Sequence, residues 1–377
     1  MAPTPREFRL KVPDAALADL KERLARTRWP DEPPLEPWST GSSLAYVKEL
    51  CEYWRSRFDW RAWEARLNAF PQFTANVSGI ELHFIHARSP NAQAMPLLLS
   101  HGWPGSVFEF HKLIPLLTPH FHVVAPSLPG YGLSFKPGQR RFGVEDIAAC
   151  FAELMGALGY ARFGAQGGDW GGFISSVLGH RFRERLIGIH LNLLAVRRDA
   201  KMVADPTPEE KAFARDLAQW LKEETGYQAI QGTKPQTLAF GLTDSPAGLA
   251  AWIAEKFHAW SDCGGRIENA VSRDELLANI SLYWYTGAIG SSFWPYYARL
   301  HGPWPVPEGQ TVDVPTAYAA FPKEIVRPPR SVAARTYTDI RRWTVMPKGG
   351  HFAALEQPAL LAEDVIAFFG SLGAGQR

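Results

Sequence analysis

Glycines surround a single aspartate, Asp169, in the run Gly-Gly-Asp-Trp-Gly-Gly. The six residues before this run, 161–166, read as a short strand, and residues 173–180 have the apolar spacing of a helix. A strand that turns at glycines directly into a helix is typical of a nucleophile elbow, and Gly167, Asp169 and Gly171 meet its pattern G-x-Nuc-x-G. The chain contains no G-x-S-x-G, so Asp169 stands where esterases carry a serine.

An aspartate nucleophile suits displacement at a saturated carbon. A serine in that role would become an alkyl ether without a carbonyl, whereas an aspartate becomes an ester that a second step can hydrolyse. The elbow therefore predicts displacement at an sp³ carbon followed by ester hydrolysis. Two other interpretations of the turn stay open: Asp169 could only cap the following helix, or the turn could bind phosphate, although neither G-x-G-x-x-G nor G-x-x-x-x-G-K-[ST] is met there.

The second step needs a base for water and an acid that orients this base. His351 lies in a glycine loop directly after the last predicted strand, which agrees with the order nucleophile, acid, histidine. Four carboxylates lie between the expected helical region and His351. Asp313 and Asp339 lie at strand entrances, and Glu308 precedes the strands. Glu324 lies at a strand exit, where parallel sheets place their sites, so we predict that it is the acid that orients His351. The alternative is that Glu324 is a solvated loop glutamate.

Backbone N–H groups must stabilise the ester oxygen as it becomes charged. Trp170 directly follows the nucleophile and supplies one such donor by the geometry of an elbow. Trp103, in the His-Gly-Trp-Pro loop of residues 101–104, is placed to supply the second. An ordinary proline turn is the alternative for that loop.

A mostly parallel sheet covered on both faces is expected to position these residues. Predicted strands alternate with helices in the first half of the chain, which is typical of α/β proteins. The predicted strands are 80–85, 96–100, 121–126 and 161–166, and after a helical region 314–321 and 342–346; the helices between them are about 106–117 and 144–158, with a last helix at 358–369.

Four regions follow from this pattern. They are an N-terminal helical arm (1–75), the first part of the α/β core (76–197), a helical lid (198–300) and the second part of the core (301–377). Thr207 with Glu210, Ser245, and Ser272 with Glu275 are predicted to begin helices of the lid, and Gly226 to end the first of them.

Composition excludes several classes of function. Net charge is +2 and the basic residues form no run, so a nucleic acid partner is not expected. Cys51, Cys150 and Cys263 lie far apart without C-x-x-C or H-E-x-x-H, which predicts a reducing compartment and no structural metal. Residues 1–10 have no apolar core of a signal peptide, and no run of about 20 apolar residues exists. A cytoplasmic protein without a membrane anchor is the expectation.

Four motifs taken in this order resemble those of the microsomal-type epoxide hydrolases. They are His-Gly-Trp-Pro at 101–104, Gly-Gly-Asp-Trp-Gly at 167–171, Phe-Pro-Lys-Glu at 321–324 and Gly-Gly-His-Phe-Ala-Ala at 349–354. The resemblance spans nearly the whole chain and implies an α/β-hydrolase fold with an inserted helical lid and an N-terminal helical arm. It also implies that an apolar epoxide and water become a vicinal diol through an ester on Asp169, without metal or organic cofactor. The family's membrane anchor has no counterpart here, so the resemblance is to its soluble members.

The resemblance adds two lid tyrosines that donate hydrogen bonds to the epoxide oxygen. The first matches Tyr227, and the second matches Tyr296, with Tyr297 as the adjacent alternative. A phenol suits this task because it donates a proton yet stays neutral at pH 7. Three tryptophans of the expected lid and loops hint at an apolar epoxide, with an aromatic one among the options: Trp103, Trp284 and Trp294.

Two other functions are compatible with the same residues. A haloalkane or haloacid dehalogenase uses the same Asp-His-acid set, although it needs halide donors rather than paired hydroxyls. A hydrolase fold without activity could serve as a small-molecule receptor, which the complete set of Asp169, His351 and Glu324 disfavours. The oligomeric state stays open, with a homodimer among the options.

Overall fold

The computed structural model describes residues 4–197 and 205–373. Within them, one sheet has the strand order β1-β2-β3-β5-β4-β6-β7-β8-β9. The pairs β1–β2, β2–β3 and β3–β5 are antiparallel. The five remaining pairs, from β5–β4 to β8–β9, are parallel. The strands are β1 (Arg6–Glu7), β2 (Gln72–Val77), β3 (Ile80–Ala87), β4 (Met95–Ser100), β5 (Phe121–Pro126), β6 (Phe163–Gly167), β7 (Leu186–Leu191), β8 (Thr316–Ala320) and β9 (Ile340–Val345).

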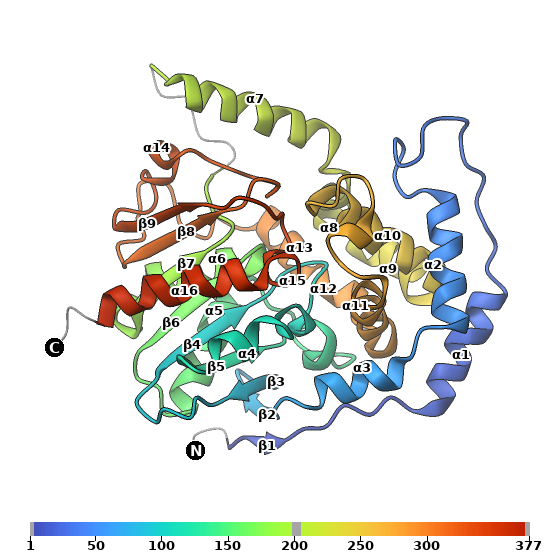
Figure 1. Cartoon of the computed structure of the whole chain (residues 1–377), viewed down its shortest axis with the longest axis horizontal. Helices are drawn as coiled ribbons and strands as arrows, with labels where there is room; N and C mark the ends of the chain where they lie inside the picture. The colour runs from blue at the N-terminus through green and yellow to red at the C-terminus, as the bar shows by residue number, and fades with distance from the viewer. Residues whose placement is uncertain (1–3, 198–204, 374–377) are drawn as a thin grey trace.

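Helices cover both faces of this sheet (Figure 1). Because side chains alternate along a strand, Leu98 packs into one hydrophobic core with α5 and α6, and Leu97 and Leu99 pack into a second core with α4 and α16. The α/β class expected from the sequence is confirmed. The covering elements are η1 (Val107–Phe110), α4 (Leu113–Leu117), η2 (Gly132–Ser134), α5 (Val144–Ala157), α6 (Trp170–Arg181), η3 (Arg183–Arg185), α14 (Arg330–Ala333), α15 (Ala353–Glu356) and α16 (Pro358–Gly373).

Strands β2 and β7 and the short β1 were not expected from the sequence. The strand β2 alternates polar and apolar residues, a strand pattern that the sequence reasoning overlooked, whereas a glycine and a histidine interrupt the apolar run of β7. Gly188 in β7 is nonetheless required by packing, because a Cβ atom there would lie 2.9 Å from the Pro315 carbonyl oxygen. In β7, pairing with β6 and β8 outweighs this weak local signal.

A block of helices, which we call the helical insertion (residues 205–301), interrupts the alternation between β7 and β8. The described part of it contains helices and turns and no strand: α7 (Pro208–Glu223), α8 (Gly226–Thr233), α9 (Pro235–Asp244), α10 (Pro246–Trp260), η4 (Ile267–Asn269), α11 (Arg273–Thr286), α12 (Ile289–Ser292) and α13 (Trp294–His301). The expected start of this region, at residue 198, lies outside the described residues. In Figure 1, α7 extends along the top of the molecule, and near its start the Glu210 carboxylate accepts a 2.9 Å hydrogen bond from the Ser331 hydroxyl on α14.

The predicted helix starts of the insertion are confirmed. Thr207 forms a capping box at α7, Ser245 caps α10, and Ser272 forms a capping box at α11. The predicted role of Gly226 is wrong. This glycine does not adopt the left-handed conformation that such a helix end uses, and α8 begins at it.

The N-terminal segment contributes α1 (Asp14–Ala25), α2 (Leu44–Ser56) and the unexpected α3 (Trp60–Leu67). Helices α1 and α2 pack against α10 of the insertion. The Trp54 indole on α2 donates a 2.9 Å hydrogen bond to the Ser281 hydroxyl on α11. These contacts fix the position of the insertion relative to the N-terminal segment.

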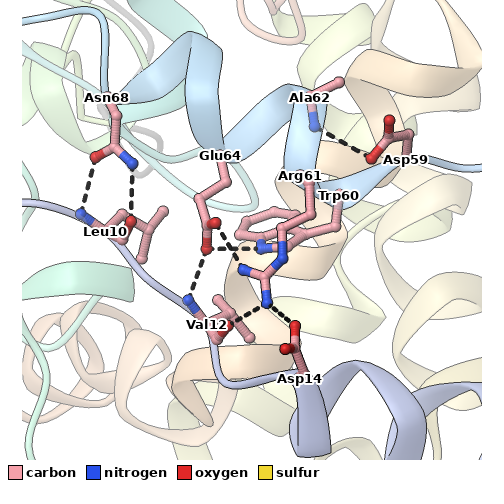
Figure 2. Close-up of polar contacts among 9 residues, drawn as sticks. All are labelled: Leu10, Val12, Asp14, Asp59, Trp60, Arg61, Ala62, Glu64 and Asn68. Atoms are coloured by element: carbon pink, nitrogen blue, oxygen red, sulfur yellow. Dashed lines mark hydrogen bonds and ion pairs between the residues drawn. The ribbon is translucent and has the colours of Figure 1, made fainter.

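Helix α3 fastens the extended chain that precedes α1 (Figure 2). The buried carboxylate of Glu64 accepts hydrogen bonds from the Val12 N–H at 2.6 Å and the Arg61 guanidinium at 2.6 Å. The Asn68 amide group bonds to both the N–H and the carbonyl of Leu10, each at 2.8 Å. The Asn68 side chain thus satisfies both backbone hydrogen-bonding groups of Leu10, as a neighbouring strand would do in a sheet.

Among the described residues, no helix has the length and apolar character needed to cross a membrane. All three cysteines are buried and form no disulfide: Cys51, Cys150 and Cys263.

Candidate active site

Asp169 lies in a sharp turn between β6 and α6. Its backbone has φ 48° and ψ −129°, a conformation that costs a non-glycine residue of order 1–3 kcal/mol. Two glycines are required for this turn. A Cβ atom on Gly167 would lie 2.2 Å from the Gly171 carbonyl oxygen, and one on Gly171 would lie 1.8 Å from the Ser100 carbonyl oxygen. The turn therefore has the geometry of a nucleophile elbow, with Asp169 at its apex.

The structure brings together the three residues that the sequence assigned to one set. His351 Nε2 lies 3.5 Å from Asp169 Oδ2, and His351 Nδ1 lies 2.6 Å from Glu324 Oε1. Asp169 follows β6, Glu324 follows β8 and His351 follows β9, so parallel neighbours deliver all three to the same edge of the sheet. His351 and Glu324 are buried, at 4% and 3% exposure.

Electrostatics favour a protonated His351 before substrate binds. Burial lowers the pKa of the imidazole, but the carboxylates of Glu324 and Asp169 outweigh burial and hold this pKa well above 6.5. The Ile325 N–H donates a 2.7 Å hydrogen bond to the Glu324 oxygen that faces the imidazole. The Trp260 carbonyl accepts from the His351 N–H at 2.9 Å, which fixes the loop that carries the histidine.

The Trp103 amide lies next to Asp169, where the sequence predicted an N–H donor. The Trp103 N–H donates a 2.7 Å hydrogen bond to Asp169 Oδ1. Trp170 is the first residue of α6, so its N–H has no acceptor within its own helix. The Trp103 amide is thus placed to stabilise an oxyanion on Asp169, and the role of the Trp170 amide stays a prediction.

Helix α11 holds the loop that carries Trp103, a connection that the sequence did not reveal. The Asn279 amide donates to the Pro104 carbonyl and the Tyr283 hydroxyl donates to the Gly105 carbonyl, each at 2.7 Å. Both side chains are buried. Their only signal in the sequence was that polar residues stand among the apolar ones of this helix, as Glu275 and Ser281 also do.

A cavity of about 400 Å³ lies between the sheet edge and the helical insertion, and Asp169 is among the residues that line it. Tyr227 and Tyr296 both line it, and their ring centres are 5.6 Å apart. Tyr297 does not line this cavity, because its ring stacks between Trp294 and His301. The lining residues are Asp169, Trp170, Phe173, Leu193, Leu221, Thr225, Tyr227, Gln228, Ala229, Tyr296, Arg299, Leu300, Trp304 and Ile325.

The aromatic wall differs from the one suggested by the sequence. Trp284 and Trp294 are not among the residues that line the cavity, whereas Trp170 and Trp304 are. Trp103 is fully buried, and its ring stacks on that of Tyr227 at 5.3 Å between centres. Spacing along the chain could not show which tryptophans face the cavity, because the insertion folds back on the sheet.

Glu109, on η1, was missed by the sequence reasoning. It lines a second cavity, of about 10 Å³, together with Asp169 and His351. That volume is enough for about one water molecule. The residue as a whole is half-buried, but its carboxyl group lies inside the protein, and burial raises its pKa to about 8. A carboxyl group between two phenylalanines, directly after the Trp103 loop, was the available signal.

The chain is similar to proteins of one family along nearly its full length. Residues 5–110 match the family described as epoxide hydrolase N terminus, and residues 95–204 match the alpha/beta hydrolase fold. Epoxide hydrolase 1 of Oryctolagus cuniculus is 36% identical over 404 residues, which cover 97% of this chain and 88% of that protein.

Solved structures agree with this similarity. The Aspergillus niger epoxide hydrolase superposes with a TM-score of 0.86 at 32% identity, over 98% of this chain and 97% of that one. The juvenile hormone epoxide hydrolase of the silkworm Bombyx mori gives a TM-score of 0.88 at 31% identity, over 100% and 96% of the two chains.

Proposed function

This chain belongs to the microsomal-type epoxide hydrolases, and from that premise we propose that Asp169 opens an apolar epoxide by forming a covalent ester. The observation that carries the proposal is the contact of each Asp169 oxygen with a different partner. Oδ1 accepts from the Trp103 N–H at 2.7 Å, and Oδ2 lies 3.5 Å from His351 Nε2. One oxygen is thereby held for the oxyanion hole while the other is available to attack.

Ring opening is the first step. Oδ2 of ionised Asp169 bonds to a ring carbon while the bond from this carbon to the epoxide oxygen breaks. Tyr227 and Tyr296 donate hydrogen bonds to the departing oxygen, which receives a proton. Both hydroxyls act on charge that is absent from the bound substrate and grows as the ring opens, so they accelerate the step.

Ester formation then converts His351 into a base. Two carboxylates hold its pKa up in the free enzyme, and the ester removes the charge of one of them. The pKa falls and the imidazole releases a proton, which balances the proton gained by the epoxide oxygen. His351 is therefore neutral when a base is needed.

Hydrolysis of the ester completes the cycle. His351 takes a proton from a water molecule, which attacks Cγ of Asp169, while the Trp103 and Trp170 amides stabilise the charge on Oδ1. The 10 Å³ cavity between Asp169, His351 and Glu109 is the proposed position of this water. The diol leaves as the ester bond breaks, and the Asp169 carboxylate and protonated His351 are restored.

The cavity supports an apolar substrate of moderate size. Its volume of about 400 Å³ is in the range of small-molecule sites, and its walls are largely aromatic and aliphatic. Helix α8 carries Tyr227 and α13 carries Tyr296, so the helical insertion serves as a lid that places both donors over the nucleophile. The pair of buried hydroxyls favours an epoxide over a haloalkane, whose leaving halide needs no proton.

Trapping of the ester tests the proposal. His351→Gln enzyme mixed with a styrene-type epoxide should gain one epoxide mass, and digestion should place it on Asp169. His120→Gln changes an exposed histidine and should turn over like the wild type. Diol production at the normal rate by His351→Gln, or an adduct on a different residue, contradicts the proposal.

A further inference from the structure

Lys256, on α10, is a buried cation next to one of the two tyrosines. The residue is 6% exposed, and its Nζ atom lies 4.7 Å from the centre of the Tyr227 ring and 5.3 Å from that of Trp260. Lysine is almost never fully buried without a partner, and here Glu255 Oε2 lies 2.5 Å from Nζ. The ammonium group of Lys256 therefore lies between the Glu255 carboxylate and the rings of Tyr227 and Trp260.

A cation over the face of a phenol ring stabilises negative charge on that ring. Attraction between the cation and the ring increases as the ring becomes more electron-rich, and it is strongest where water is excluded. Tyr227 becomes more electron-rich as it gives its proton toward an epoxide oxygen. The charge of Lys256 therefore interacts more strongly with the transition state of ring opening than with the resting enzyme.

A second neighbour acts on Tyr227 in the same direction. The Gln228 amide donates a 2.8 Å hydrogen bond to the Tyr227 hydroxyl oxygen. An oxygen that accepts from an amide holds a developing negative charge better, since the donor is already aligned with it. Both Lys256 and Gln228 thus stabilise the deprotonated form of Tyr227.

The surroundings of Tyr296 differ. Its ring packs edge-on against Trp170 at 4.7 Å and against Trp103 at 5.8 Å between centres. Indole rings stabilise a phenolate far less than an ammonium group does. Both tyrosines are buried, at 4% for Tyr227 and 6% for Tyr296, and burial raises the pKa of Tyr296 well above its usual range. The ammonium group over the Tyr227 ring is what distinguishes the two. The two tyrosines are therefore not equivalent.

We propose that Lys256 is a positioning residue that polarises Tyr227, so that Tyr227 transfers its proton to the opening epoxide oxygen while Tyr296 contributes a hydrogen bond only. The inference rests on the proposed ester mechanism. In ring opening, the Asp169–carbon bond forms, the carbon–oxygen bond breaks, and the released oxygen takes the proton of Tyr227. His351 then releases a proton to solvent, and the Tyr227 phenolate takes up a proton from solvent, so the protons balance.

Single-turnover kinetics separate this role from a structural one. Lys256→Met should slow ester formation about tenfold and leave ester hydrolysis within about twofold, because Tyr227 acts only in the first step. Lys256→Arg keeps the charge and should restore most of the rate. Lys222→Met is the matched control, since Lys222 also pairs with the adjacent glutamate, at 2.8 Å, but is 76% exposed on α7.

A double-mutant comparison makes the test specific. Lys256→Met should slow ester formation in a Tyr296→Phe background and have little further effect in Tyr227→Phe. Equal slowing in both backgrounds, or equal slowing of both chemical steps, overturns the inference. Lys256→Gln provides a second neutral variant if Lys256→Met does not fold. A wild type that forms no ester overturns the mechanism itself, whereas an ester that forms at a rate independent of Lys256 overturns this inference alone.

Discussion

The Trp103 backbone N–H lies 2.7 Å from Oδ1 of Asp169 and donates a hydrogen bond to it. This contact makes the two carboxylate oxygens different before any substrate arrives. Oδ1 already occupies the position where the carbonyl oxygen of an ester would be, and Oδ2 faces His351. The same amide that orients the nucleophile would therefore stabilise the oxyanion in the second step, without rearrangement of the loop.

Glu324→Gln should separate the two chemical steps. The amide keeps the shape of the side chain but removes the charge that faces His351 Nδ1 at 2.6 Å. We expect ester hydrolysis to slow by a factor on the order of 10²–10⁴ and ester formation to change little, so that the alkylated enzyme accumulates. Rapid-quench mass spectrometry measures both rates. Equal slowing of the two steps would count against the role of Glu324.

Asp169→Asn tests the change in His351 that ester formation is proposed to cause, because its amide is a neutral stand-in for the ester. The pKa of His351 should be lower in this variant than in the wild type, as measured by NMR of the imidazole. Because the pKa of His351 in the fold lies above 6.5, the protonated imidazole stabilises the fold fully below pH 6.5. This stabilisation is lost as pH rises through the folded-state pKa. The loss should be smaller in Asp169→Asn and should end at a lower pH, because it still begins near pH 6.5. Identical titration in the two proteins contradicts the switch.

Gly171→Ala should disrupt the elbow. The added methyl group would lie 1.8 Å from the Ser100 carbonyl oxygen, so backbone atoms must move, at a cost of about 3 kcal/mol or more. Gly241→Ala is the matched control, because this glycine lies within α9 and a Cβ atom there meets nothing within 4 Å. The control should be stabilised by up to about 1 kcal/mol. Thermal unfolding that ranks the two variants in the opposite order would show that the elbow is not tightly packed.

Glu109→Gln should reveal the buried carboxyl group through the pH dependence of stability. The pKa of Glu109 is about 8 in the folded protein and 4.5 in the unfolded chain. Between these values the unfolded chain loses a proton that the folded chain keeps, so wild-type stability falls as pH rises. The variant lacks this loss, and its advantage should grow by up to about 1.4 kcal/mol per pH unit until about pH 8. A difference that stays constant with pH would show that Glu109 is ionised in the fold.

Glu109→Leu addresses the proposed water position. It removes a polar wall of the 10 Å³ cavity, so ester hydrolysis should slow while ester formation stays within about twofold. Both rates follow from the same rapid-quench experiment. Unchanged hydrolysis would place the attacking water at another site.

Much of the site was predictable because its chemistry depends on strand ends. Asp169, Glu324 and His351 each follow a strand, and parallel strands deliver their carboxyl ends to one edge. Position along the chain therefore translated directly into position in space. Tyr227 and Tyr296 came only from the resemblance to a family, since nothing in their spacing sets them apart from other tyrosines.

The supporting residues were not predictable, because they act across long separations in sequence. Asn279 reaches the Pro104 carbonyl from a helix 175 residues away. Lys256 and Glu109 look like ordinary charged residues of helical stretches, and only folding shows that one is over a tyrosine ring and the other beside the nucleophile. The strand β7 was missed for a similar reason, since its pairing with β6 and β8 compensates for a weak local pattern.

A single turnover in heavy-oxygen water tests the central claim most directly, with enzyme in excess over a styrene-type epoxide. If Asp169 forms an ester that water opens at its carbonyl carbon, the first diol carries no label and the peptide containing Asp169 gains it. Label in the diol of the first turnover, with an unlabelled Asp169, would mean that water attacks the epoxide directly and would contradict the account.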